Sequence, residues 1–363
     1  MFTKPPLRVS RLIAQETARA ISINRLAELI RSANEEAGTN CRVSGKMLKK
    51  IRDNPEKVGL TWNILVALHT YFKKHGASLQ HLPILETRGV LEVLVDARRL
   101  VFLLGAKPRP EERRTDLSRW DTRSHTELLT QVSQMGMHRK FDTEDVLWRS
   151  PVDPAAIRSE SWYRVLDDDQ ASVVSIGSPL AALSSEIMLA RMFGVQPFET
   201  PHFKTGRPVP FFFVWRPMLA EGFHSAFGLT PRELQADHPE LASRVERDES
   251  SAFILEGTPH ESRVEAQSWT MHGIIAAQRR AAGNVWLVVS GLAGPATFGT
   301  AAVVKQIVTE LPWSAKGPSP VLWVPVKVHI RAGKPMPLEG DIREVVDAEF
   351  DGDPRTWPNE NRR

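Results

Sequence analysis

The fold is constrained most strongly by a pattern after residue 80, where short apolar runs alternate with longer polar stretches of helical periodicity. The runs are mostly apolar on both faces, which is typical of strands buried between two layers, and helices between such strands favour parallel connections. Strands are expected at residues 90–95, 100–104, 172–176, 210–215, 284–290 and 321–329, and helices at residues 124–134, 185–193, 261–282 and 299–311. The pattern predicts an α/β layer sandwich with a mostly parallel sheet.

The first 80 residues differ, because short amphipathic stretches separated by turn residues replace the apolar runs. Ser22, Ser44 and Thr61 each precede such a stretch, and a hydroxyl side chain is a favoured helix N-cap. We therefore place a domain boundary near residue 85. The expected organisation is a small all-α domain at residues 1–85, an α/β domain at residues 86–350 with a charged loop at residues 107–119, and a disordered polar tail at residues 351–363.

Length and composition are those of a soluble protein with two or three domains, because the chain has 363 residues, 42% of them hydrophobic and 25% charged. The apolar runs are far shorter than the roughly 20 residues of a membrane span. Charge and proline interrupt the first residues before the apolar core of a signal peptide could form. The single cysteine, Cys41, excludes an intrachain disulfide and fits a reducing compartment. We expect a cytoplasmic protein without a membrane partner.

Charge is divided unevenly along the chain. Residues 1–80 contain 14 Lys and Arg against 6 Asp and Glu, whereas the other 283 residues contain 33 against 37. Within the basic part, the segment RVSGKMLKKIR at residues 42–52 predicts a helix with one apolar face and one cationic face. Such a helix is the electrostatic signature expected of an element that contacts phosphates.

This segment, with the apolar helix expected at residues 60–72, resembles the recognition region of lambda-repressor-like (XRE-type) helix-turn-helix domains. The resemblance covers about the first 75 residues and implies a duplex-DNA partner, with the basic helix in the major groove. The DNA contacts that it implies are Arg42, Ser44, Lys46, Lys49, Lys50 and Arg52. Trp62, Tyr71 and Phe72 fall on or near the apolar stripe, which favours duplex DNA over single strands. The alternative is that the lysines form an ordinary solvated helix face.

Glycine directly follows an apolar run, and precedes a helical stretch, at Gly177 and again at Gly291. In an open parallel sheet such turns lie at the carboxyl ends of strands, where ligands bind and helix N-termini attract anions. Neither turn has the P-loop or the complete dinucleotide-binding pattern, and glycine gives a turn backbone freedom whether or not a ligand binds. In outline the pattern resembles Rossmann-like sensor and nucleotide-processing domains of prokaryotes, which implies a nucleotide-like ligand. The candidate ligand-binding residues are Gly177, Ser178, Gly291, Gly294, Thr297, Gly299 and Thr300.

Candidates for catalysis and for metal binding are few. Glu186 begins a helical stretch just after a glycine turn, where a nucleotide-cleaving enzyme could hold a carboxylate, although an acidic residue there is also a common helix-dipole partner. The histidines show no metal-binding spacing such as H-E-x-x-H. We therefore assign no catalytic set, no metal site and no cofactor beyond a nucleotide-like ligand.

Three hypotheses follow from these features. The first is a prokaryotic DNA-binding protein, a transcriptional regulator whose α/β domain senses a ligand or forms a homo-oligomer. The second is an enzyme of a prokaryotic defence type that processes a nucleotide or an NAD-like molecule, with the basic domain as its trigger. The third is an oligomeric scaffold without a small-molecule ligand.

Overall fold

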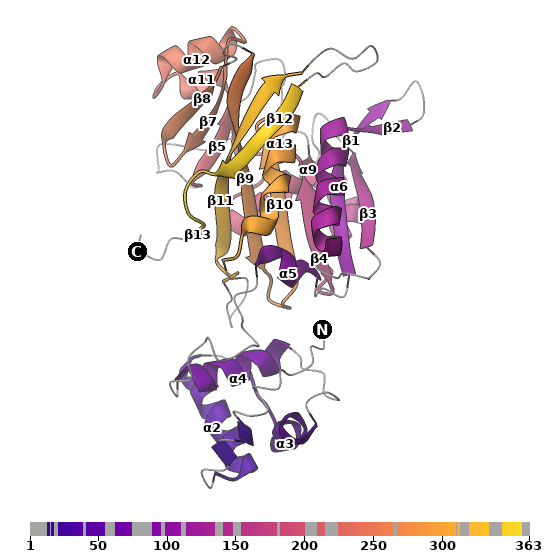
Figure 1. Ribbon diagram of the computed structural model, residues 1–363, viewed down its shortest axis with the longest axis vertical. Helices are drawn as coiled ribbons and strands as arrows, with labels where there is room; N and C mark the ends of the chain where they lie inside the picture. Colours follow the sequence, from indigo (N-terminus) through magenta and orange to yellow (C-terminus); the bar gives the residue numbers. More distant parts are fainter. Residues whose placement is uncertain are drawn as a thin grey trace.

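A computed structural model shows a group of three helices within residues 21–74 and a larger α/β part from residue 89 onward (Figure 1). The residues that the structure describes are 13–14, 16–17, 21–38, 41–54, 62–74, 89–95, 99–109, 114–134, 141–147, 154–179, 182–199, 209–214, 224–263, 267–309, 311–312, 319–333 and 343–357. The expected boundary near residue 85 lies outside them.

The helical group consists of α2 (Ile23–Glu36), α3 (Gly45–Asp53) and α4 (Trp62–Lys74). The predicted caps at Ser22 and Ser44 are confirmed, because each hydroxyl accepts a hydrogen bond from a backbone N–H of the first turn. Thr61, the third predicted cap, lies outside the described residues. The apolar stripes of the helices meet in one core that includes Leu26, Ile30, Leu48, Ile51, Leu68 and Phe72.

The larger part is built on a nine-stranded sheet with the order β12-β11-β9-β10-β4-β1, in which β2 and β3 also pair with β1, and β13 with β11. Strands β1, β3, β4 and β10 are mutually parallel, whereas β9, β11, β12 and β13 add antiparallel pairs. The strands are β1 (Arg99–Arg109), β2 (Arg114–Leu117), β3 (Phe141–Leu147), β4 (Ala171–Ile176), β9 (Ser268–Arg279), β10 (Val285–Gly291), β11 (Val321–Ala332), β12 (Arg343–Phe350) and β13 (Arg355–Trp357).

The predicted fold class is therefore wrong, because the sheet is mixed and not mostly parallel. The error arises at residues 261–282, where the expected helix is replaced by the end of one strand and by the long strand β9. A tight turn closed by the bond from Arg280 N to Asn284 O, with Gly283 at a φ of +90°, joins β9 to β10. Such a hairpin needs no crossover helix, so the connection is antiparallel.

Other segments also differ from the sequence expectation. Residues 90–95 form the helix α5 (Val90–Val95) and not a strand. The expected charged loop at 107–119 contains the end of β1, paired with β2, and the start of a helix. In the expected disordered tail, Arg355–Trp357 forms β13, which pairs with the first residues of β11.

Helices cover one face of the large sheet. They are α5, α6 (Arg119–Gln134) and α13 (Gly294–Ala302), followed by the 3-10 turn η6 (Val304–Gln306). Side chains alternate between faces, so that Phe102 and Val174 pack beneath these helices while Leu103 and Val173 pack on the other side. That other side holds α9 (Leu183–Phe193), α7 (Pro154–Ser159) and α8 (Ser161–Val165).

A second, four-stranded sheet packs on the same side as α9. Its order is β6-β5-β7-β8, and two short helices accompany it (Figure 1). Phe211 on β5 contacts Trp323 on β11, and Phe253 on β7 stacks on His272 of β9, so aromatic side chains join the two sheets. The elements are β5 (Phe211–Val214), β6 (Gly228–Leu229), α11 (Pro231–Leu234), α12 (Pro239–Glu246), β7 (Ser251–Leu255) and β8 (Thr258–Ser262).

Candidate functional site

The cationic helix predicted in the basic segment is α3. Its side chains Lys46, Lys49 and Lys50 are exposed, as is Arg42 before the helix, and none of them forms an ion pair with another described residue. Arg52 is only half-exposed and its Nε lies 2.7 Å from Oδ1 of Asp53, a contact that lowers the pKa of Asp53. Ser44 accepts a hydrogen bond from Met47 N at 3.2 Å, so its hydroxyl caps the helix. Four of the six implied DNA contacts are thus exposed cations without an ion pair to a described residue.

The two glycine turns of the α/β part lie at one edge of the large sheet. They follow β4 and β10, which are parallel neighbours with Val289 opposite Ile176. Gly177 N donates to Val289 O at 3.0 Å and so ties the first turn to the second strand. The helices α9 and α13 begin shortly after these turns, and their N-terminal ends therefore lie at the same edge.

Packing explains most of the glycines in these turns. A Cβ on Gly291 would lie 2.2 Å from Thr297 N, one on Gly294 would lie 2.5 Å from the ring of Trp120, and one on Gly299 would lie 2.4 Å from Val328. These three positions bring backbone close to a neighbouring element. The requirement for glycine there is steric, whether or not a ligand binds.

The predicted threonines are buried within α13. Thr300 is fully buried and its Oγ1 donates to Ala296 O at 2.7 Å, while Thr297 is 2% exposed and its Oγ1 lies 3.4 Å from Ala293 O. Both hydroxyls are bonded to the carbonyl four residues earlier in the helix. Of the other predicted ligand-binding residues, Gly294 is partly exposed, whereas Gly177 and Ser178 are buried.

Asp121, which the sequence does not single out, lies at this edge. It is in the first turn of α6, is 6% exposed, and its carboxylate oxygens lie 3.8 and 3.9 Å from where a Cβ of Gly177 would stand. Its carboxyl accepts no hydrogen bond from another described residue, and burial raises its pKa to about 7. A largely buried carboxyl with a raised pKa is a frequent mark of a functional site.

Three helix N-termini meet around Asp121. Trp120 precedes it and touches Gly294 at the start of α13, while the turn that leads to α9 contains Gly177. Arg123 lies over the rings of Trp120 and Phe298, with its Cζ 4.8 and 4.7 Å from their centroids. The positive ends of the helix dipoles and this guanidinium make the edge attractive to an anion.

Glu186, the predicted catalytic candidate, has a structural environment. It is fully buried in α9, and its carboxylate accepts hydrogen bonds from Phe198 N at 2.9 Å, Ala226 N at 2.9 Å and Ser225 Oγ at 2.7 Å. Burial raises its pKa, whereas these three donors act in the opposite direction. The carboxylate fixes two loops against α9.

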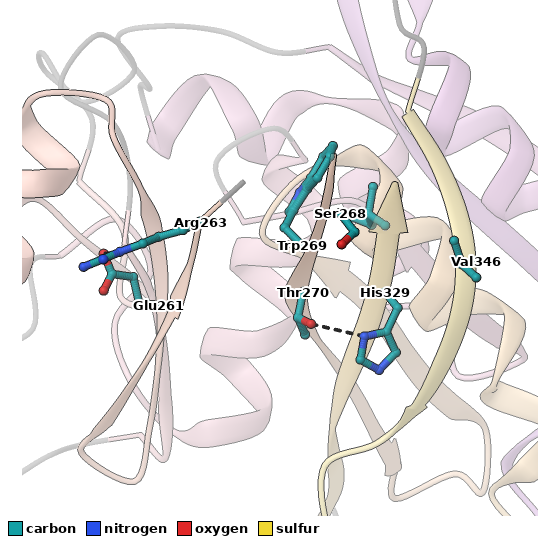
Figure 2. A pocket seen from close by; sticks show the side chains of 8 residues that line it. Glu261, Arg263, Ser268, Trp269, Thr270, His329 and Val346 are labelled. Atoms are coloured by element: carbon teal, nitrogen blue, oxygen red, sulfur yellow. Dashed lines mark hydrogen bonds and ion pairs between the residues drawn. The ribbon is translucent and has the colours of Figure 1, made fainter. Parts of the chain in front are cut away.

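A pocket of about 660 Å³ lies between the two sheets (Figure 2). Glu261 and Arg263 approach it from β8 and the residue after it, while Thr270 on β9 and His329 on β11 line the opposite side. The Oγ1 of Thr270 and Nδ1 of His329 are 3.1 Å apart. Ser268, Trp269, Ile330 and Val346 complete the lining.

Beside this pocket the structure brings together three possible metal ligands, His260, His272 and Asp351. The sequence pattern missed them because they lie on different strands, without the short helical spacing of a metal motif. The sequence contained only a partial signal, because the polar His272 directly precedes the apolar stretch from Gly273 to Ala277 within β9.

Comparison with protein-family models, with curated proteins and with solved structures finds no match to this chain. Among the helices that the structure describes, none is both long and apolar enough to cross a membrane.

Proposed function

We propose that this protein binds duplex DNA through the cationic face of α3. The observation that carries the proposal is the exposure of Lys46, Lys49 and Lys50 on a short helix whose opposite side, with Leu48 and Ile51, is buried. A helix held by its apolar side can enter a major groove with its charged side. The excess of positive charge over the first 80 residues supports the same partner.

Fluorescence anisotropy with labelled duplex DNA at two salt concentrations tests this proposal. In the triple variant K46A/K49A/K50A we expect weaker binding and a slope of log K against log salt that is smaller in magnitude by about 2–3, since each lost phosphate contact contributes about 0.9. Unchanged affinity and slope would show that this surface is not the DNA contact.

A matched control variant removes three positive charges from side chains that already form ion pairs. Arg25, Arg31 and Lys74 are exposed in the same helical group and form ion pairs with Glu28, Glu35 and Glu36, respectively. The variant R25A/R31A/K74A should keep the salt slope within one unit of the wild-type value. An equal loss of DNA affinity in both variants would indicate a general effect of net charge and not a contact made by the cationic face of α3.

For the α/β part we propose an anionic, nucleotide-like ligand at the carboxyl edge of β1, β4 and β10. The support is the convergence of three helix N-termini on Asp121, with Arg119 and Arg123 in the first turns of α6. Backbone N–H groups and the guanidinium groups suit phosphate, and a carboxyl group suits a sugar hydroxyl. Ligand binding at this edge would make the protein a ligand-responsive DNA-binding protein.

Isothermal titration calorimetry with ATP, NAD⁺ and inorganic phosphate tests the ligand proposal. Binding of at least one nucleotide should weaken about tenfold or more in R119A/R123A, because charge-assisted hydrogen bonds are lost. The control R158A/R232A removes two exposed arginines from α7 and α11 and should bind as the wild type does. No binding of any of the three probes by the full chain would contradict the proposal.

An enzyme that processes a nucleotide is a second candidate, and Asp121 is the observation that favours it. A carboxyl with a pKa of about 7 can donate or accept a proton near neutral pH. This candidate requires turnover of ATP or NAD⁺ that falls at least 100-fold in Asp121→Asn. Glu186→Gln should retain most of the turnover, since Glu186 is bonded within the fold and lies away from solvent.

A further inference from the structure

Three metal-ligating side chains from three separate elements meet between the two sheets. His260 lies on β8, His272 on β9, and Asp351 directly after β12. One donor atom from each lies within 4.8 Å of the other two. Oδ2 of Asp351 is 3.6 Å from Nε2 of His272 and 3.9 Å from Nδ1 of His260.

Two residues of this cluster, His272 and Asp351, have donor atoms without a hydrogen-bond partner among the described residues. Both ring nitrogens of His272 and Oδ2 of Asp351 are buried without a partner, and the side chains are 5% and 15% exposed. Leaving such buried groups unsatisfied destabilises the folded protein. A bound ion would satisfy Nε2 of His272 and Oδ2 of Asp351 together.

The spacing fits a small divalent cation. In a tetrahedral zinc site with bonds of about 2.0–2.1 Å, the ligand atoms are about 3.3–3.4 Å apart. The observed separations of 3.6 and 3.9 Å from the Asp351 oxygen need a contraction of about 0.2–0.6 Å, and the donor atoms of the two histidines lie within 4.8 Å of each other. Two imidazoles and one carboxylate are also the donor set that zinc prefers, and they leave one position open.

Neighbouring residues hold the ligands in place. Nζ of Lys327 lies 2.8 Å from Oδ1 of Asp351, which orients the other oxygen toward the histidines, and the ring of Phe253 stacks on His272 with an interplanar angle of 3°. Glu349 stands opposite Lys327 in the β11–β12 register, and its Oε1 lies 3.9 Å from Nε2 of His329.

The pocket of Figure 2 begins next to this cluster. Its lining residue Thr270 lies two residues before His272, on the same face of β9. Glu261, which also lines the pocket, directly follows His260 on β8. His329 of the pocket and Lys327 of the cluster are likewise two residues apart on β11. The open coordination position can therefore be filled by water or by a polar group of a molecule in the pocket.

We propose that His260, His272 and Asp351 form a binding site for a divalent transition metal, with zinc as the expected ion. The ion joins β8, β9 and the segment after β12, and so fastens the small sheet to the large one. None of the three ligands belongs to α3 or to the glycine turns, although the backbone carbonyl of His272 accepts a hydrogen bond from Leu292 N, directly after Gly291.

Titration of the full chain with Zn²⁺ after dialysis against EDTA tests the proposal. We expect about one tightly bound equivalent by calorimetry, and a rise in Tm of about 5–10 °C when free Zn²⁺ is 100-fold above Kd. Replacement by Co²⁺ should give the visible absorption of a tetrahedral site. The same concentration of Mg²⁺ should raise Tm by less than 1 °C, because Mg²⁺ prefers oxygen ligands.

Two conservative variants locate the site. His260 is 25% exposed, so His260→Gln is compatible with folding, and Asp351→Asn keeps the side-chain shape. Each should weaken Zn²⁺ binding at least tenfold, with an unchanged far-ultraviolet circular dichroism spectrum. His238→Gln, on a half-buried histidine before α12, is the control and should bind as the wild type does. Absence of Zn²⁺ binding by the wild type, or equal binding by all variants, would overturn the proposal.

Discussion

The carboxylate of Asp121 lies against Gly177, with its oxygens 3.8 and 3.9 Å from the position of a Cβ on that glycine. The two residues come from different elements, because Asp121 is in the first turn of α6 and Gly177 follows β4. A side chain at residue 177 would further cover the carboxyl group of Asp121, a residue that is only 6% exposed. The glycine thus keeps the remaining access to Asp121 open.

Asp121 makes folding less favourable as the pH rises. Burial raises its pKa to about 7 from an ordinary value of 3.8, so the folded protein binds this proton more tightly than the unfolded chain does. The protonated carboxyl of Asp121 therefore makes its full contribution to the free energy of unfolding below about pH 4. Between about pH 4 and pH 7 this contribution falls by about 3–4 kcal/mol.

Replacement of Asp121 by Asn should remove this dependence. We expect Asp121→Asn to be more stable than the wild type at pH 8 by about 2–4 kcal/mol and similar to it at pH 4. Urea unfolding of both proteins at pH 4, 6 and 8 measures the difference. Parallel stability profiles for the two proteins would show that Asp121 does not titrate in this range.

Gly177 and Gly194 offer a comparison between two glycines with positive φ. Gly177 has a φ of +119° and an added Cβ would lie 3.1 Å from Cβ of Ala182, whereas Gly194 has a φ of +73° with nothing within 4 Å. Gly194→Ala should cost about 1 kcal/mol through backbone strain alone. Gly177→Ala should cost about 2–3 kcal/mol in thermal or urea unfolding, because steric contact adds to the strain. Equal costs would exclude a steric role at residue 177.

Glu186 should matter for stability more than for chemistry. Its Oε1 accepts from the backbone N–H of Phe198, which has a φ of +63°, so the carboxylate helps to hold that residue in the left-handed region. Glu186→Ala leaves two backbone N–H groups and the Ser225 hydroxyl without this acceptor and should cost about 3–5 kcal/mol. Glu186→Gln keeps an acceptor and should cost about 1 kcal/mol.

The control for Glu186 is Glu240 on α12, whose side chain is 92% exposed and lies 3.9 Å from Arg244. Glu240→Ala should change the free energy of unfolding by less than about 0.5 kcal/mol, as for other exposed helix pairs. A similarly small effect of Glu186→Ala would contradict the structural role assigned to Glu186.

Asn34 should hold α2 and α4 together. It is fully buried, and its Nδ2 donates to Ile30 O at 2.8 Å in its own helix and to Ala67 O at 2.9 Å in α4. Asn34→Leu removes both bonds and should reduce the stability of the helical group by about 1–3 kcal/mol. Hydrogen exchange of residues 23–36 and 62–74 should accelerate accordingly. Ser32→Ala, at an exposed position of α2, should leave the exchange unchanged.

Local sequence signals predicted the elements that depend on local interactions. Ser22 and Ser44 cap helices because a hydroxyl reaches the N–H groups of the next turn, whatever surrounds the helix. The central strands β4 and β10 were expected at residues 172–176 and 284–290, since runs apolar on both faces need two covering layers.

The errors occurred where a short apolar run suits either kind of element. Val90–Val95 is long enough for a strand or for a turn and a half of helix, and its contact with η6 places it as a helix above the sheet. Residues 268–279 combine β-branched and small side chains without a clear period, and the hairpin with β10 makes them a strand. In both cases packing partners distant in the sequence decide the structure.

The sequence by itself determined the capped helices, the two central parallel strands with their glycine turns, and the cationic side of α3, because each depends on residues within one or two turns or on one strand. Only the tertiary structure decided that the sheet is mixed, that Asp121 stands against Gly177, and that His260 and His272 meet Asp351. These relationships depend on strand order and register, which bring distant residues together and which no local pattern of side chains specifies.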